Sequence, residues 1–146
     1  MKEVDFPIMS LAEKQQRLIA KFAIIEDAQE RLAVIVSRGK KWPGLTNEEK
    51  TDAHRVKGCV SQVWIVGERE GDRCRFRMDA DSPLVKGLVA VQCELYDGES
   101  AAEIVATEPA WVEALGLESR LSPTRLNGLA SVGEAIRAFA ASRLPG

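Results

Sequence analysis

One cysteine in this 146-residue chain directly follows a glycine and precedes a strongly apolar run. Gly58 can adopt backbone angles that other residues avoid, so a tight turn there would hold Cys59 at its tip. Residues 63–66 are β-branched or aromatic, as expected of a stiff strand that anchors the turn. Arg55 and Lys57 lie nearby in sequence, and cations favour the thiolate that acts as the nucleophile. Cys59 is therefore the first candidate for covalent chemistry with another protein.

The other cysteines and the single histidine are predicted to have structural roles, and Cys59 itself has a structural alternative. The alternative interpretation of Cys59 itself is a buried, unreactive thiol, because free cysteine is among the most buried residue types. Cys74 and Cys93 fall on apolar faces and are predicted to be core residues. His54, the only histidine, is interpreted as a solvated loop residue, although its spacing leaves a dyad with Cys59 open. No cluster of ligands with zinc-site spacing is present, so a metal site is not predicted.

Composition narrows the class of protein. The formal net charge of −2 argues against a generic nucleic-acid binder. No apolar run approaches the roughly 20 residues of a membrane helix, and the first five residues do not resemble a signal peptide. Three cysteines at irregular spacing do not suggest a disulfide framework. We therefore expect a cytoplasmic protein in a reducing compartment, with no nucleic-acid or membrane partner.

Two helices are predicted before the cysteine. Ser10 with Glu13 has the pattern of a capping box, and Asp27 with Glu30 resembles a second cap. Gly39 is expected to end the second helix. These helices would form a hairpin, followed by a long loop to Cys59. Their predicted core stripes are Leu11, Leu18, Phe22 and Ile25, then Ala28, Leu32, Ile35 and Val36.

The middle of the chain changes to strand periodicity. Residues 61–68 are apolar on both faces, which predicts a strand that is covered on both sides or central in the sheet. After a turn at Gly71-Asp72, a second strand alternates. Ser82 and Pro83 then begin a helix whose wide apolar surface is typical of a buried central helix. In the second strand Cys74, Phe76 and Met78 are predicted to point inward, and Arg73, Arg75, Arg77 and Asp79 outward.

The last third is predicted to be helical. Ser100 would cap a short helix, and a second short helix would end at Gly116. Ser122-Pro123 would start a long final helix. The whole pattern predicts a single α+β domain over residues 1–146, with a small antiparallel sheet packed by helices. The final helix is expected to bury Leu129, Val132, Ile136 and Phe139.

Three segments resemble the SufE family of sulfur-acceptor proteins. Residues 58–64, Gly-Cys-Val-Ser-Gln-Val-Trp, match the family pattern G-C-x-S-x-V-W. Residues 79–81 with 85–88 are similar to its D-x-D … V-K-G-L segment. Residues 121–129 are similar to its L-[ST]-P-[ST]-R-x-x-G-L segment. The matches occur in the family's order and span most of the chain.

The resemblance implies a SufE/NifU-like fold and a function in sulfur transfer. A cysteine desulfurase of the SufS or CsdA kind, which carries pyridoxal phosphate (PLP), would form a persulfide on its own cysteine. Cys59 would take the terminal sulfur and pass it to an iron–sulfur scaffold or another acceptor. The PLP belongs to the partner, so this chain is expected to bind no cofactor. It would be an accessory and activator of the desulfurase rather than a stand-alone enzyme, and a monomer or weak homodimer.

Five residues are expected to support Cys59. Gly58 and Ser61 belong to the family motif, and Lys57 precedes it. Asp81 and Arg125 fall in the other family-like segments near helix starts, and we expect them to shape the pocket or interface around the cysteine.

Two alternative functions belong to other classes of protein. A thiol redox protein using Cys59 would need a resolving cysteine, and Cys74 and Cys93 are both predicted to be buried. A scaffold that itself holds an iron–sulfur cluster would need several ligands brought together.

Overall fold

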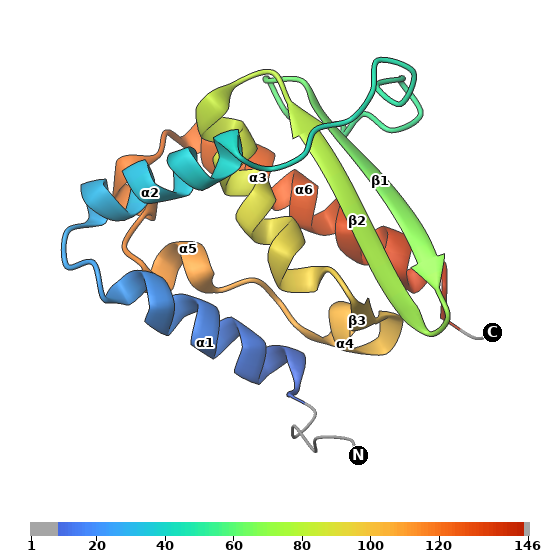
Figure 1. Ribbon diagram of the computed structural model, residues 1–146, viewed down its shortest axis with the longest axis horizontal. Helices are drawn as coiled ribbons and strands as arrows, with labels where there is room; N and C mark the ends of the chain where they lie inside the picture. Colours follow the sequence, from blue (N-terminus) through green and yellow to red (C-terminus); the bar gives the residue numbers. More distant parts are fainter. Residues whose placement is uncertain (1–8, 145–146) are drawn as a thin grey trace.

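The computed structural model describes residues 9–144 and has the predicted α+β architecture (Figure 1). Its three-stranded antiparallel sheet has the order β1-β2-β3, which confirms the fold class. Two elements, β3 and a 3₁₀ helix (η1), were not predicted. The elements are α1 (Leu11–Ala23), α2 (Ala28–Lys40), β1 (Val63–Glu70), β2 (Arg73–Ala80), α3 (Pro83–Tyr96), β3 (Glu99–Ser100), α4 (Ala101–Ala106), α5 (Trp111–Ala114), η1 (Glu118–Arg120) and α6 (Pro123–Ala141).

Helix α3 is the centre of the fold, as predicted. Ser82 caps it by accepting a hydrogen bond from the Val85 amide, and Pro83 occupies its first turn. Its residues from Gly87 to Cys93 are all buried, because α1, α2, α6 and strand β2 pack around it. The hairpin of β1 and β2 lies on one side of α3, α1 lies on the other, and α6 passes behind α3 and the hairpin (Figure 1).

The prediction that Gly39 ends α2 is wrong. The helix continues to Lys40, and Gly39 is buried inside it. A Cβ atom on Gly39 would lie 2.5 Å from the Gly87 Cα, so glycine is required by the close approach of two backbones. This approach fixes α2 against the N-terminal half of α3.

Both predicted N-terminal caps are present. Ser10 and Glu13 form a complete capping box, and Asp27 accepts a hydrogen bond from the Glu30 amide. However, Ile25 lies beyond the end of α1 and is only half-buried, and the buried face of α1 includes Gln15, which was not predicted. Each helix packs on α3 more closely than on the other, so they form a looser pair than the predicted hairpin.

The hairpin of β1 and β2 turns at Gly71, whose φ of 65° favours glycine. The predicted alternation is confirmed for Cys74, Phe76 and Met78, which are buried, and for the three arginines of the strand, which are exposed. Asp79 is an exception: it is buried, because its carboxylate has partners inside the fold.

Strand β1 lies at the edge of the sheet, not at its centre. The chain leading to Cys59 pairs with the first residues of its outer edge. The Val56 amide donates to the Val63 carbonyl at 2.8 Å, and the Ile65 amide donates to the His54 carbonyl at 2.9 Å. The loop that carries Cys59 is therefore tied to β1 at its base.

Helix α6 is the long final helix that was predicted. Ser122 caps it by accepting from the Arg125 amide. Leu129, Val132 and Ile136 are buried as predicted, while Phe139 is half-buried and meets Phe76 edge-on, with ring centroids 5.6 Å apart. Ser100 caps α4, and Gly116, at a φ of 69°, follows α5, both as expected. Within residues 9–144 no helix has the length and apolarity needed to cross a membrane.

Candidate functional site

The loop that carries Cys59 has a glycine where the backbone requires one. Gly58 has a φ of 91°, a conformation that side chains strongly disfavour. A Cβ atom there would also lie 2.5 Å from the Ser131 Oγ on α6. The expectation that Gly58 sets a tight turn is therefore confirmed, and the turn brings the loop against α6.

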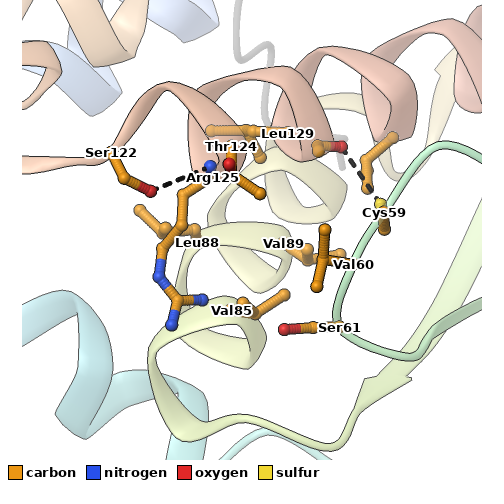
Figure 2. A pocket seen from close by; sticks show the side chains of 12 residues that line it. Cys59, Val60, Ser61, Val85, Leu88, Val89, Ser122, Thr124, Arg125 and Leu129 are labelled. Atoms are coloured by element: carbon orange, nitrogen blue, oxygen red, sulfur yellow. Dashed lines mark hydrogen bonds between the residues drawn. The ribbon is translucent and has the colours of Figure 1, made fainter.

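Cys59 is half-buried, and its thiol points inward (Figure 2). The Sγ donates a hydrogen bond to the Gly128 carbonyl oxygen on α6 at 3.3 Å. Burial raises the pKa of the Cys59 thiol, and Arg55 lowers it by a smaller amount. The expected cation-activated thiolate is thus wrong for this conformation, because desolvation outweighs the nearby charge.

The thiol faces an apolar cavity of about 160 Å³. Three segments far apart in the sequence build it: the loop, the first half of α3 and the first half of α6 (Figure 2). The loop contributes Cys59, Val60 and Ser61; α3 contributes Val85, Leu88 and Val89; and α6 with its cap contributes Ser122, Thr124, Arg125, Gly128, Leu129 and Val132. The cavity and the thiol therefore form one site.

Of the five supporting residues, Ser61 and Arg125 line this cavity. The Arg125 side chain is half-buried and lies across the cavity from Cys59 in Figure 2. None of the ion pairs among residues 9–144 includes Arg125. The site thus contains a cation without a carboxylate partner in the described part of the chain.

Asp81 does not line the cavity but holds the base of the loop. Its carboxylate accepts a hydrogen bond from the Gln62 amide at 3.2 Å, and its own amide donates to the Gln62 carbonyl at 3.1 Å. Lys57 and Gly58 lie on the outer side, where they line a second, more open hollow with Asp52, Arg55, Val56 and Cys59. Val60 at the loop tip is 80% exposed, although it also lines the cavity.

Asp79, which sequence reasoning placed on the solvent side, anchors the long connector before the loop. Its carboxylate accepts from the Leu45 amide at 3.0 Å and from its own neighbour Ala80 at 2.9 Å, and it pairs with Lys50 at 3.1 Å. Burial would raise the pKa of Asp79, but these hydrogen bonds and Lys50 hold the pKa below its usual value. The D-x-D pattern was the available signal, since its two aspartates hold the connector and the loop base respectively.

A second ion pair ties the same connector to β2. Glu49 and Arg77 approach to 2.6 Å, and this hydrogen bond lowers the pKa of Glu49 to about 2. The His54 ring nitrogen Nδ1 pairs with the Glu49 carbonyl oxygen at 2.7 Å. The ring therefore belongs to the connector, and a dyad with Cys59 gains no support.

Cys74 and Cys93 are both buried, as predicted, and Cys93 on α3 has no exposed surface. Burial strongly raises the pKa of the Cys93 thiol. Among residues 9–144, no group of three or more histidine, cysteine, aspartate or glutamate side chains could hold a metal ion.

Sequence reasoning assigned the aliphatic wall of the cavity to the core. Val85, Val89 and Leu129 follow the same helical periodicity as buried residues, so the pattern could not separate a cavity wall from close packing.

The fold and the site define a small α+β protein that presents a loop cysteine above an apolar cavity. The model of the SufE family, described as an Fe-S metabolism associated domain, matches residues 16–140. The chain therefore belongs to the SufE family, which supports a role in iron–sulfur metabolism.

Relatives of the chain agree with this assignment. It is 36% identical over 126 residues to an uncharacterised SufE-like protein of Rhizobium etli, covering 83% of this chain and 85% of the relative. It is 35% identical over 116 residues to one from Synechocystis, covering 80% and 73% respectively. The solution structure of a hypothetical protein from Thermus thermophilus has the same fold, with a TM-score of 0.73 at 22% identity, covering 88% of this chain and 94% of that one.

Proposed function

We propose that this protein accepts sulfur from a PLP-dependent cysteine desulfurase on Cys59 and passes it on for iron–sulfur cluster assembly. The observation that carries the proposal is the Cys59 thiol, held on a glycine-backed loop above an apolar cavity, within the SufE motif. Loops move more readily than helices and strands, so a loop thiol can enter a partner's active site and return.

The transfer is an exchange between sulfur atoms. The Cys59 thiolate attacks the terminal sulfur of the desulfurase persulfide, a new S–S bond forms, and the desulfurase thiolate leaves. The product is Cys59-S-SH, and no external oxidant or reductant is needed. The raised pKa of the resting thiol means that Cys59 must leave its buried position to ionise readily. Loading is therefore coupled to outward movement of the loop.

The cavity would hold the transferred sulfur after the loop returns to its resting position. When the loop closes, the terminal sulfur of Cys59-S-SH would extend into the space lined by Val85, Val89 and Leu129. The aliphatic wall of the cavity shields the cargo from water. The hydrogen bond from the thiol to the Gly128 carbonyl would be lost on loading, because the inner sulfur of a persulfide carries no hydrogen.

The remaining parts of the proposal follow from this role. PLP stays with the desulfurase, because every step on this chain uses only a thiol. Cys74 and Cys93 are buried, which favours a sulfur carrier over a thiol redox protein with a resolving cysteine. Free thiols at all three cysteines fit a reducing cytoplasm. The acceptor is an iron–sulfur scaffold, and the carrier acts as a monomer or weak homodimer.

The test is intact mass after incubation with a cysteine desulfurase and free cysteine. We expect a gain of sulfur that is removed by a thiol reductant, absent in Cys59→Ser and retained in a Cys74→Ala/Cys93→Ala double variant. A sulfur gain that persists in Cys59→Ser would contradict the proposal, as would no gain with the desulfurase encoded in the same genome.

A further inference from the structure

The cavity beside Cys59 has the composition of a binding site for a small anion-bearing molecule. Of the 12 residues that line it, one is a cation and none is a carboxylate. Small-molecule sites are typically apolar hollows with a few convergent polar groups. Here those groups are the Arg125 guanidinium and the hydroxyl groups of Ser61 and Thr124.

Arg125 has no carboxylate partner among the described residues, in contrast to three other arginines. Arg38, Arg75 and Arg77 each lie within 3.0 Å of a carboxylate oxygen. Among residues 9–144, Arg125 is in no such pair, although its side chain is half-buried. A guanidinium presents a rigid fork of donors that matches a carboxylate. Because Arg125 also lines the cavity, a carboxylate bound there would supply this partner.

The size of the cavity exceeds what the sulfur cargo needs. An apolar cavity of about 150 Å³ holds a molecule as large as benzene, and this one measures about 160 Å³. One terminal sulfur atom of a persulfide would occupy only part of that space. In Figure 2, Cys59 and Arg125 lie on opposite sides of the cavity, with Val85 and Val89 between them. A ligand with sulfur at one end and a carboxylate at the other would contact both.

We propose that the cavity binds small thiols and persulfides that carry a carboxylate, and that Cys59 exchanges sulfur with them directly. The carboxylate would bind Arg125 and the sulfur would reach Cys59, while the chain between them packs on the aliphatic wall. This activity needs no partner protein. It does not depend on the transfer from a desulfurase proposed above.

The exchange balances without a co-reactant. The small fraction of Cys59 that is ionised in the resting position attacks the terminal sulfur of R-S-SH, an S–S bond forms to Cys59, and the S–S bond within the donor breaks. R-S⁻ leaves and takes a proton, so the net change is Cys59-SH + R-S-SH → Cys59-S-SH + R-SH. In the reverse direction, the same site unloads the cargo onto a small thiol.

The test compares two isosteric donors, the persulfides of 3-mercaptopropionate and of 3-mercaptopropanamide. The rate of sulfur gain on Cys59, followed by intact mass, is measured with each donor for the unaltered protein. We expect the carboxylate donor to react about tenfold faster or more, because a hydrogen bond to a charged group contributes at least this factor. Arg125→Gln should bring the two rates together, and Arg125→Lys should keep part of the difference.

Arg120→Gln is the matched control, because Arg120 is an exposed arginine that precedes α6 and does not line the cavity. This variant should keep the full preference for the carboxylate donor. Equal rates in the unaltered protein, or a preference that survives Arg125→Gln, would overturn the inference. A loss of stability in Arg125→Gln would slow both donors alike and leave their ratio unchanged. Loading by a desulfurase is measured separately, so the failure of one proposal does not imply the failure of the other.

Discussion

Cys59 and Cys93 are both thiols whose pKa is raised by burial, yet their positions make one far easier to expose to a reaction partner than the other. Cys93 is fully buried within α3, so exposing it requires the central helix to leave the core. Cys59 is half-buried on a loop, and exposing it requires only the few residues around Gly58 to move. The comparison indicates that the free energy needed to expose a thiol to solvent, rather than the charges around it at rest, decides which cysteine can react.

The largest effect is expected in alkylation of the native protein. With iodoacetamide, Cys59 should react at least about a thousandfold faster than Cys93, because exposing a core residue approaches the global unfolding free energy of about 5–15 kcal/mol. Peptide mapping after timed quenching gives both rates. Similar rates at the two positions would break the comparison.

The glycine behind Cys59 provides the next test. Gly58→Ala places a side chain at a φ of 91°, which should cost about 1–2 kcal/mol. The new Cβ would also displace Ser131 on α6, so the loop should shift and sulfur gain on Cys59 should slow. Chemical denaturation and intact mass measure the two effects.

Gly71→Ala is the matched control for this change. Gly71 also has a positive φ, of 65°, but nothing lies within 4 Å of its Cβ position, and it is at the far turn of the hairpin. It should lose similar stability while sulfur gain stays normal. Equal slowing in both variants would show that stability, not loop position, limits the transfer.

Asp81→Ala should loosen the base of the loop. It removes the acceptor for the Gln62 amide, a net loss of about 1 kcal/mol. Hydrogen exchange over residues 55–62 should accelerate, and the rate of sulfur transfer should change with it. Asp72→Ala, which removes an exposed carboxylate at the far turn, should alter neither. If residues 55–61 are as protected as β2 in the unaltered protein, loop movement is not part of the mechanism.

The smallest effect concerns pH. Because the pKa of the Cys59 thiol is raised, the thiol is protonated at neutral pH, and its alkylation rate should climb as pH rises through a pKa above the ordinary thiol value. Arg55→Gln should raise this pKa further, since Arg55 is the charge that lowers it. Arg69→Gln, at the far end of β1, should leave the rate profile of Cys59 unchanged. A Cys59 pKa below the ordinary value would contradict the buried resting state.

Local chemistry made much of the fold predictable. Capping patterns at Ser10, Asp27, Ser82, Ser100 and Ser122 marked the starts of five helices, because each side chain accepts a hydrogen bond from an amide in the first turn. Alternation along β2 and the turn at Gly71 gave the hairpin. The position of Cys59 on a glycine turn followed from the same local reasoning.

What failed depended on contacts between distant segments. Gly39 is compatible with a helix end in sequence, but its real role is the contact with Gly87, which lies 48 positions later. Asp79 looked solvent-facing because its partners at Leu45 and Lys50 belong to another segment. The cations before Cys59 suggested a thiolate, because sequence carries no measure of desolvation by α3 and α6. A pocket near Cys59 was expected, but its aliphatic wall was assigned to the core, because helical periodicity does not separate a cavity wall from close packing.

The most direct test of the central claim is a single-turnover transfer with ³⁴S-labelled cysteine and a cysteine desulfurase, followed by peptide mapping without reductant. The account predicts that the label appears on the peptide containing Cys59 before it appears in any acceptor, and that the peptides with Cys74 and Cys93 stay unlabelled. Label on either buried cysteine, or label reaching an iron–sulfur scaffold while Cys59 remains unmodified, would contradict it.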